Sequence, residues 1–157
     1  MQPAAQQRGF SIVEALVALV VLGVGMLGIA SLYVTSLRAG SSALLRTQAV
    51  NLAADMADRI RANPSAGTAY AGTPSSTANC AGSAPANCSP AQLAADDLFR
   101  WDQQVTNLLP DSDGNPATRQ WTIAVGGATR PRTYTITINW LEPGEANALT
   151  YALTMQI

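Results

Sequence analysis

A long run of apolar residues, Ala15–Val34, dominates the first part of the chain. A helix of this length rises about 30 Å, which matches the hydrocarbon core of a bilayer. Beyond it, apolar and small residues recur every three or four positions, as on the buried stripe of an amphipathic helix. They are Leu45, Ala49, Leu52, Ala53, Met56 and Ile60. Asn63-Pro64 ends the pattern, because the residue before proline avoids the α region. We therefore predict one helix from near Phe10 to near Ala62.

The middle of the chain has two different patterns. Residues Pro64–Pro90 hold few large apolar side chains, which predicts a long surface connection that cannot supply a core. Pro90 then opens a second helical pattern, in which large apolar residues recur at helix-like spacing. They are Leu93, Leu98, Trp101, Val105, Leu108 and Leu109.

Three segments near the C-terminus alternate apolar and polar residues: Trp121–Val125, Tyr134–Trp140 and Leu149–Met155. A period of two is typical of β-strands with one buried face. Gly126-Gly127 and Glu142–Glu145 mark the connections, so the strands should form an antiparallel meander. Its apolar face needs a cover, and the stripe of the long helix is available. The predicted fold class is α+β, a long N-terminal helix packed on a C-terminal antiparallel sheet.

Composition limits the function classes. The net charge is −1, from 9 basic and 10 acidic residues, so no strong field recruits nucleic acid. There is no histidine and no glycine-rich phosphate loop, and the usual arrangements for acid–base, nucleophilic or phosphoryl chemistry are missing. We therefore expect no catalytic residues, no cofactor and no nucleic-acid partner.

Two acidic segments invite a metal interpretation. Asp96, Asp97 and Asp102 lie in the second helical pattern, where a solvated acidic face is the favoured interpretation. Residues Asp111–Asn115 resemble the start of a calcium loop, but the bidentate Glu at its twelfth position is missing and Pro116 interrupts it. A Gly-Asn-Pro turn fits better, and we expect no metal site.

One carboxylate, Glu14, interrupts the apolar N-terminal segment. A carboxylate at the centre of a membrane helix costs about 2.5–3.5 kcal/mol, so it needs a partner. Four residues make about one helical turn, which places Glu14 just above Phe10. If the chain were cut between Gly9 and Phe10, the new α-amino group would be a cation at that depth, and the pair could form between neighbouring subunits.

Two plainer interpretations remain open, a signal anchor and a secretory signal peptide with a chance Glu. The run Ala15–Val34 is about twice the length of a typical signal-peptide core of about 7–15 residues. A plain anchor gives no reason for Glu14.

The segment Gly9–Leu22, GFSIVEALVALVVL, resembles the class III signal of type IV pilins and of type II secretion pseudopilins. The resemblance implies that a prepilin peptidase removes a leader, residues 1–9, by cutting between Gly9 and Phe10. It also implies N-methylation of Phe10 and a role of Glu14 in filament assembly.

The same resemblance implies a layout for the rest of the chain. Residues 10–34 would span the bacterial inner membrane, residues 35–63 would continue the helix in the periplasm, and residues 64–157 would form a globular head. The N-terminus would face the cytoplasm before the subunit enters the pilus. Basic residues support this orientation only weakly, because Arg38 and Arg46 beyond the span offset Arg8.

Cys80 and Cys88 enclose a short stretch of small and polar residues. In an oxidising periplasm a disulfide is the natural interpretation, since it would order a loop that has almost no apolar side chains. A pair of free thiols is the alternative. Zinc binding is disfavoured, because the stretch offers neither histidine nor carboxylates.

Two further segments, Asp55–Asn63 and the strand Tyr134–Trp140, resemble the minor-pilin family called type IV pilus modification protein PilV. This implies a low-abundance subunit that helps prime pilus assembly at or near the tip. Its partners would be the other minor pilins, the major pilin and a tip adhesin that it could present. The alternatives are a minor pseudopilin of type II secretion and a tip-exposed adhesive module that binds a ligand directly.

Overall fold

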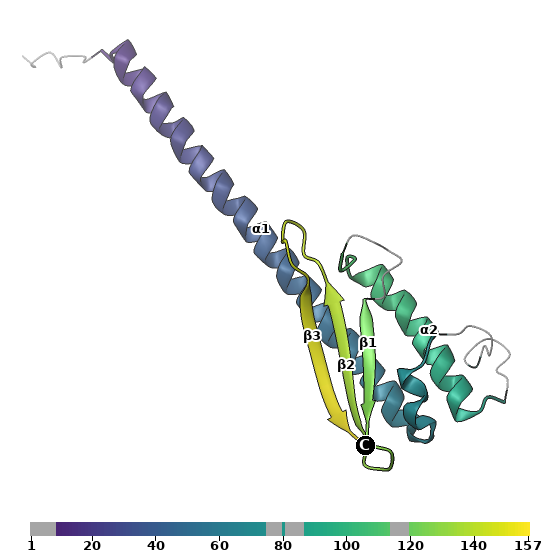
Figure 1. Cartoon of the computed structure of the whole chain (residues 1–157). Helices are drawn as coiled ribbons and strands as arrows, with labels where there is room; N and C mark the ends of the chain where they lie inside the picture. The colour runs from purple at the N-terminus through teal and green to yellow at the C-terminus, as the bar shows by residue number, and fades with distance from the viewer. Residues whose placement is uncertain (1–8, 75–79, 81–86, 114–119) are drawn as a thin grey trace, which may run out of the picture. The chain divides into compact units, whose positions relative to one another are not determined.

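The computed structural model describes residues 9–74, 80, 87–113 and 120–157. Its elements are the helices α1 (Ile12–Ala62), η1 (Pro64–Ala71, a 3₁₀ helix) and α2 (Pro90–Leu108), followed by the strands β1 (Trp121–Gly126), β2 (Thr133–Trp140) and β3 (Leu149–Gln156) (Figure 1). The chain divides into two compact units, residues 1–41 and 42–157, and α1 contributes to both. The long helix, the second helix and the three strands predicted from the sequence are confirmed.

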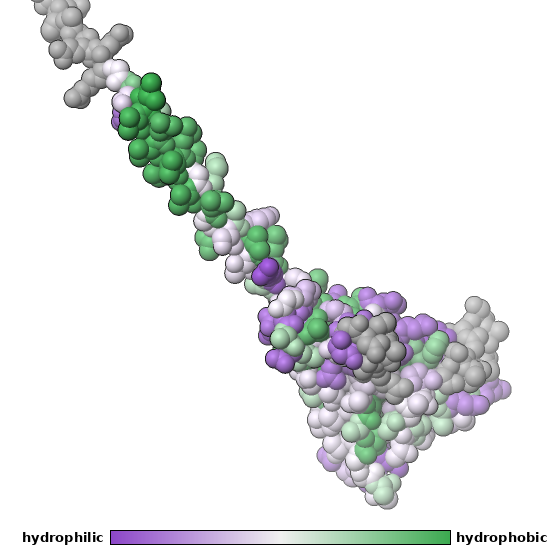
Figure 2. Space-filling view, turned by 45° about the horizontal axis from the view of Figure 1, so that its top comes forward, coloured by the Kyte–Doolittle hydropathy of each residue, from purple (hydrophilic) through white to green (hydrophobic). Residues whose placement is uncertain are grey.

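The first half of α1 is apolar on all sides. Its large hydrophobic side chains are exposed from Ile12, at 81%, to Leu37, at 59%. Figure 2 shows the N-terminal part of this segment as an almost continuous hydrophobic surface. By length and composition the helix can cross a membrane. A helix that is hydrophobic all round is stable only where water is excluded, in lipid or among other apolar helices.

The second half of α1 forms one wall of the core of residues 42–157. Its buried side chains recur every three or four residues, as the sequence predicted. They are Ala49, Leu52, Ala53, Met56, Ala57 and Ile60. The indole N–H of Trp101 on α2 donates to the carbonyl of Leu52 at 2.8 Å. This bond ties a buried side chain of α2 to the backbone of α1.

The three strands form an antiparallel sheet in the order β1-β2-β3, which confirms the predicted meander. Ile138 of β2 lies opposite Trp121 on one side and Tyr151 on the other. Alternate residues of β2 are buried, from Tyr134 to Trp140. The apolar stripe of α1 belongs to the same core cluster as these strand residues, so the helix covers the sheet as expected (Figure 1).

The connection after α1 differs from the prediction. Residues Pro64–Ala71 are not a surface loop, because they form η1 and place Tyr70 in the core at 0% exposure. Gly67 makes this possible, with φ 58° and ψ −121°, a conformation that side chains disfavour. Its carbonyl accepts a hydrogen bond from the Tyr134 hydroxyl at 3.2 Å, and a Cβ on Gly67 would lie 3.2 Å from Nη1 of Arg132. The predicted Gly-Asn-Pro turn at 114–116 lies outside the described residues.

Candidate functional site

The predicted cleavage junction lies just before α1. Gly9, Phe10 and Ser11 are exposed and precede the first helical residue, Ile12. The Ser11 carbonyl accepts the backbone N–H of Glu14 at 3.1 Å, which begins the helix. Residues 1–8 of the predicted leader, residues 1–9, lie outside the described part of the chain. A short non-helical, exposed segment is the form of backbone that a peptidase can bind.

Glu14 lies in the first turn of α1, nearer the helix terminus than the centre. The positive end of the helix dipole stabilises a carboxylate there by about 0.3–1 kcal/mol. That is less than the cost of about 2.5–3.5 kcal/mol for an acid in the hydrocarbon core. Among the described residues Glu14 has no ion-pair partner. The helix dipole therefore offsets only part of the cost of burying Glu14, and a cation from outside the described residues could offset the rest.

The carboxylates of α2 do not form the solvated face predicted from the sequence. Asp96 is only 2% exposed and pairs with Arg100 at 3.0 Å. Asp102 accepts the indole N–H of Trp121 at 2.6 Å. Each carboxylate is therefore matched by a donor within the head, which offsets the cost of removing it from water. The prediction failed for Asp102 because its donor comes from β1, which is distant in sequence, and for Asp96 because its side chain is buried although Arg100 lies on the same helix.

Asp97 belongs to a polar network that joins α1, η1 and α2. Arg59 donates to Asp55 at 2.9 Å and to Asp97 at 3.2 Å. The Tyr70 hydroxyl lies 2.9 Å from the second oxygen of Asp97 and 3.2 Å from the carbonyl of Arg59. Burial raises the pKa of the Tyr70 phenol far above its ordinary value, and the neighbouring Asp97 raises it further. Tyr70 therefore stays neutral and fixes η1 against both helices.

The raised pKa of Tyr70 makes the head sensitive to alkali. The folded state binds the phenolic proton more tightly than the unfolded state, so its stabilising effect is complete below the ordinary tyrosine pKa of about 10 and is lost as pH rises above it. We expect Tyr70→Phe to lower the free energy of unfolding by about 1–3 kcal/mol at neutral pH, because Asp97, the nearer acceptor, loses the single hydroxyl hydrogen that lies between it and the carbonyl of Arg59. The variant should also lose less stability than the unaltered chain between neutral and strongly alkaline pH.

Chemical denaturation of the detergent-solubilised chain at several pH values measures both effects. Tyr151→Phe is the matched control, since Tyr151 is a half-buried tyrosine for which no side-chain hydrogen bond is present among the described residues. Equal alkaline sensitivity of the Tyr70→Phe variant and the unaltered chain would contradict the assignment to Tyr70.

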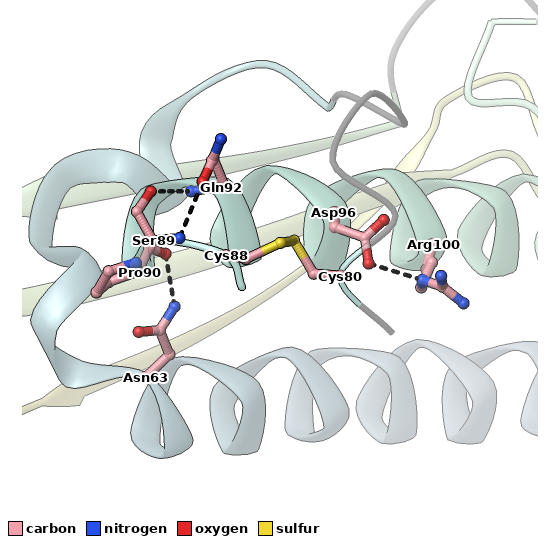
Figure 3. The surroundings of a disulfide bond; sticks show 8 residues. All are labelled: Asn63, Cys80, Cys88, Ser89, Pro90, Gln92, Asp96 and Arg100. Atoms are coloured by element: carbon pink, nitrogen blue, oxygen red, sulfur yellow. Dashed lines mark hydrogen bonds and ion pairs between the residues drawn. A yellow bond between two sulfur atoms is a disulfide. The ribbon is translucent and has the colours of Figure 1, made fainter. Parts of the chain in front are cut away.

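Cys80 and Cys88 are joined by a disulfide at the start of α2 (Figure 3). Immediately after Cys88, Ser89 caps α2 by accepting the backbone N–H of Gln92, while the Gln92 side chain accepts the backbone N–H of Ser89. The Asn63 side chain, at the end of α1, donates to the carbonyl of Pro90 at 2.8 Å. The disulfide, the capping box and Asn63 together fix where α2 begins.

Breaking the disulfide should loosen this end of α2 without unfolding the head. Closing so short a loop contributes at most about 3 kcal/mol in the chain-entropy account. We expect Cys80→Ser with Cys88→Ser to lower the free energy of unfolding by no more than this, and to speed hydrogen exchange mainly near Ser89. Intact-mass analysis with a thiol-alkylating reagent checks the oxidised state first. Two free thiols in the chain extracted from cells would contradict the pairing.

Sequence reasoning missed Tyr70 and Asn63 as organising residues. The only signal for Tyr70 was its size, as the one large side chain in Pro64–Gly72. Asn63 marks the end of α1, as Asn63-Pro64 predicts, but its bond to Pro90 does not follow from the local pattern. Among the described residues no group of three His, Cys, Asp or Glu side chains could hold a metal ion.

Comparison with known families gives two matches. Residues 5–30 match the model of the prokaryotic N-terminal methylation motif, which covers Gly9, Phe10 and Glu14. Residues 31–99 match the model described as type IV pilin Tt1218, which covers the second half of α1, η1, the disulfide and the first part of α2. No curated protein and no solved structure matches the chain significantly.

Proposed function

Because the chain is a type IV pilin-like protein with an N-terminal methylation motif, a structural protein and not an enzyme, we propose that it is a minor pilin that helps initiate pilus assembly. The observation that carries the proposal is Glu14, an acid without an ion-pair partner among the described residues, at the start of a helix whose apolar side chains are exposed. Such a helix needs lipid or other apolar helices around it. A filament core of parallel helices would supply both that environment and a cation.

The methylation motif implies processing by a prepilin peptidase. We place the cut between Gly9 and Phe10 and the methyl group on the new amino group of Phe10. The mature chain would then hold residues 10–34 in the inner membrane, with the helix 35–63 and the head 64–157 in the periplasm. In the assembled pilus the amino group of a neighbouring subunit would meet Glu14.

The placement among minor pilins rests on the end of α1 and on the disulfide. The segment Asp55–Asn63, which resembles the PilV family, supplies Met56 to the core, Arg59 to the network with Asp97, and Asn63 to the start of α2. The disulfide lies in the middle of the chain, whereas major pilins usually carry theirs near the C-terminus. A low-abundance subunit at or near the tip, in contact with other minor pilins and the major pilin and able to present an adhesin, fits these features.

A minor pseudopilin of type II secretion is the second candidate, since the N-terminal methylation motif supports it equally. A tip-exposed module that itself binds a ligand is a third. Both share the helix and the predicted processing with the first candidate. They differ from it in which assembly the chain joins and in whether the head contacts anything beyond its neighbours.

The deciding experiment deletes the gene for this chain and measures the number of surface pili, secretion and surface attachment, and a parallel experiment with the intact gene identifies the proteins that co-purify with the chain. A minor pilin predicts fewer surface pili with unchanged secretion, and co-purification with other minor pilins from detergent extracts, read by mass spectrometry. Loss of secretion with normal pili would instead support the pseudopilin. Normal pilus numbers with loss of surface attachment would favour the adhesive module.

A further inference from the structure

The outer edge of β3 carries a row of unpaired backbone groups. β3 ends the order β1-β2-β3, so in the described part of the chain no strand lies beyond it. Arg132 and Ile157 exchange two backbone hydrogen bonds, at 2.7 and 2.9 Å. Bonded and non-bonded pairs alternate along an antiparallel ladder, so the residues of β3 opposite 133, 135, 137 and 139 turn their N–H and C=O groups outward. These residues are Thr150, Ala152, Thr154 and Gln156.

Independent contacts support this phase of the ladder. The backbone N–H of Asn139 donates to Gln120 at 2.7 Å, away from β3. The hydroxyl of Thr150 donates to the Asn139 side chain at 2.8 Å, and the hydroxyls of Thr135 and Thr154 lie 3.2 Å apart. Such side-chain bonds form across non-hydrogen-bonded pairs, where the strands bring side chains closest. The backbone groups that face outward therefore belong to the residues of β3 whose side chains are exposed: Thr150, Ala152, Thr154 and Gln156.

Nothing in β3 protects this edge. Edge strands are usually blunted by charged residues, proline or a bulge. Leu149–Gln156 contains no charged residue and no proline, and its register with β2 runs without interruption. The other edge of the sheet differs, because β1 packs against η1. An unprotected edge is thus confined to one side of the head.

An apolar groove lies beside the same edge on the side of α1. It has a volume of about 210 Å³ and is lined by Arg46, Val50, Trp140, Leu149, Thr150 and Tyr151. Val50 is 43% exposed there, although it lies in the half of α1 that packs on the sheet. Arg46 pairs with Glu142 at 3.4 Å, so the one cation of the groove is already matched. The groove therefore favours a neutral, apolar side chain.

We propose that the edge of β3 is a docking site for an extended segment of another filament subunit, which adds a strand to the sheet and places an apolar side chain beside Val50. A row of N–H and C=O groups repeating every two residues, about 6.6–6.8 Å, is matched by an extended backbone. The uncharged strand and the groove select a segment that alternates apolar and polar residues. The inference rests on the proposed function, which supplies the neighbouring subunit.

Hydrogen exchange in intact assemblies tests the proposal. The amides of Thr150, Ala152, Thr154 and Gln156 should exchange rapidly in the full chain in detergent, whereas the amides of Tyr151 and Leu153, which face β2, should not. In sheared filaments all four outward amides should exchange at least about tenfold more slowly. Unchanged exchange in filaments that contain the chain would overturn this inference alone, and absence of the chain from filaments would overturn the proposed function as well.

A backbone substitution gives a second measurement. Ala152→Pro removes one outward N–H without breaking a bond to β2, and Ala152→Ser keeps that N–H. We expect the proline variant to keep the melting temperature of the head and to fall at least about fivefold in filaments, as for loss of one hydrogen bond, while the serine variant is unchanged. Equal filament content of the two variants would contradict the proposal. Protection that appears when the purified chain alone is concentrated would overturn the proposed partner in favour of a second copy.

Discussion

Replacing Glu14 with alanine is expected to leave membrane insertion intact and to lower incorporation into filaments by about tenfold. Removing the acid makes the N-terminal helix more apolar, so the monomer should insert at least as well. Assembly, by contrast, would lose the proposed attraction to a neighbouring amino group, which a low dielectric strengthens. The proposed contacts between heads would remain, so we expect weakened rather than abolished assembly.

The measurement is the amount of the chain in sheared pili, divided by its amount in membranes. Glu145→Ala is a matched control, because Glu145 is an exposed acid of the head and is remote in sequence from the helix. The control should leave the ratio unchanged. An unchanged ratio for Glu14→Ala would rule out the assembly role of this carboxylate.

A bulky residue at position 9 is expected to block processing almost completely. Gly9 directly precedes the predicted cut, where a peptidase that accepts glycine leaves little space for a larger side chain. Gly9→Leu should therefore keep residues 1–9 attached, whereas Gly9→Ala should still be processed because alanine is nearly as small. Uncleaved chain cannot expose the amino group of Phe10, so the leucine variant should also be missing from pili.

Mass analysis of the N-terminus decides the outcome. The processed chain should begin at Phe10 and carry one extra methyl group. All nine basic residues are arginine and there is no lysine, so amine-directed labelling reports the N-terminus alone. Mature protein that begins at Met1, or beyond Val34, would contradict the predicted junction.

Much of this fold could be predicted, because its elements differ in period. The stripe that ends at Ile60 and the alternation of Tyr134–Trp140 both reappear as buried faces. Burial follows from spacing when an element packs on one side only. The N-terminal motif could also be predicted from the sequence. A single charged side chain in a long apolar segment raises the free energy of membrane insertion, so its presence indicates a function.

The parts that could not be predicted depend on contacts between distant residues. The sequence around Asp97 indicates a surface acid. In the structure its carboxylate contacts the side chains of Arg59 and Tyr70. Tyr70 lies in a stretch whose composition indicates a loop, and its burial requires the backbone of Gly67 to turn as it does. Local pattern carries no information about such partners, since each contact spans 11 or more residues.

The burial of α1 within the core of residues 42–157 determines how the head can be prepared without lipid. A truncation that began at Pro64 would remove Met56, Ile60 and the rest of the stripe, and the sheet would lose the helix that covers it. The product would expose apolar strand residues to water and aggregate. A version that begins near Ser42 keeps that cover while omitting the apolar segment. Binding assays on a water-soluble head therefore require half of the long helix as part of the protein.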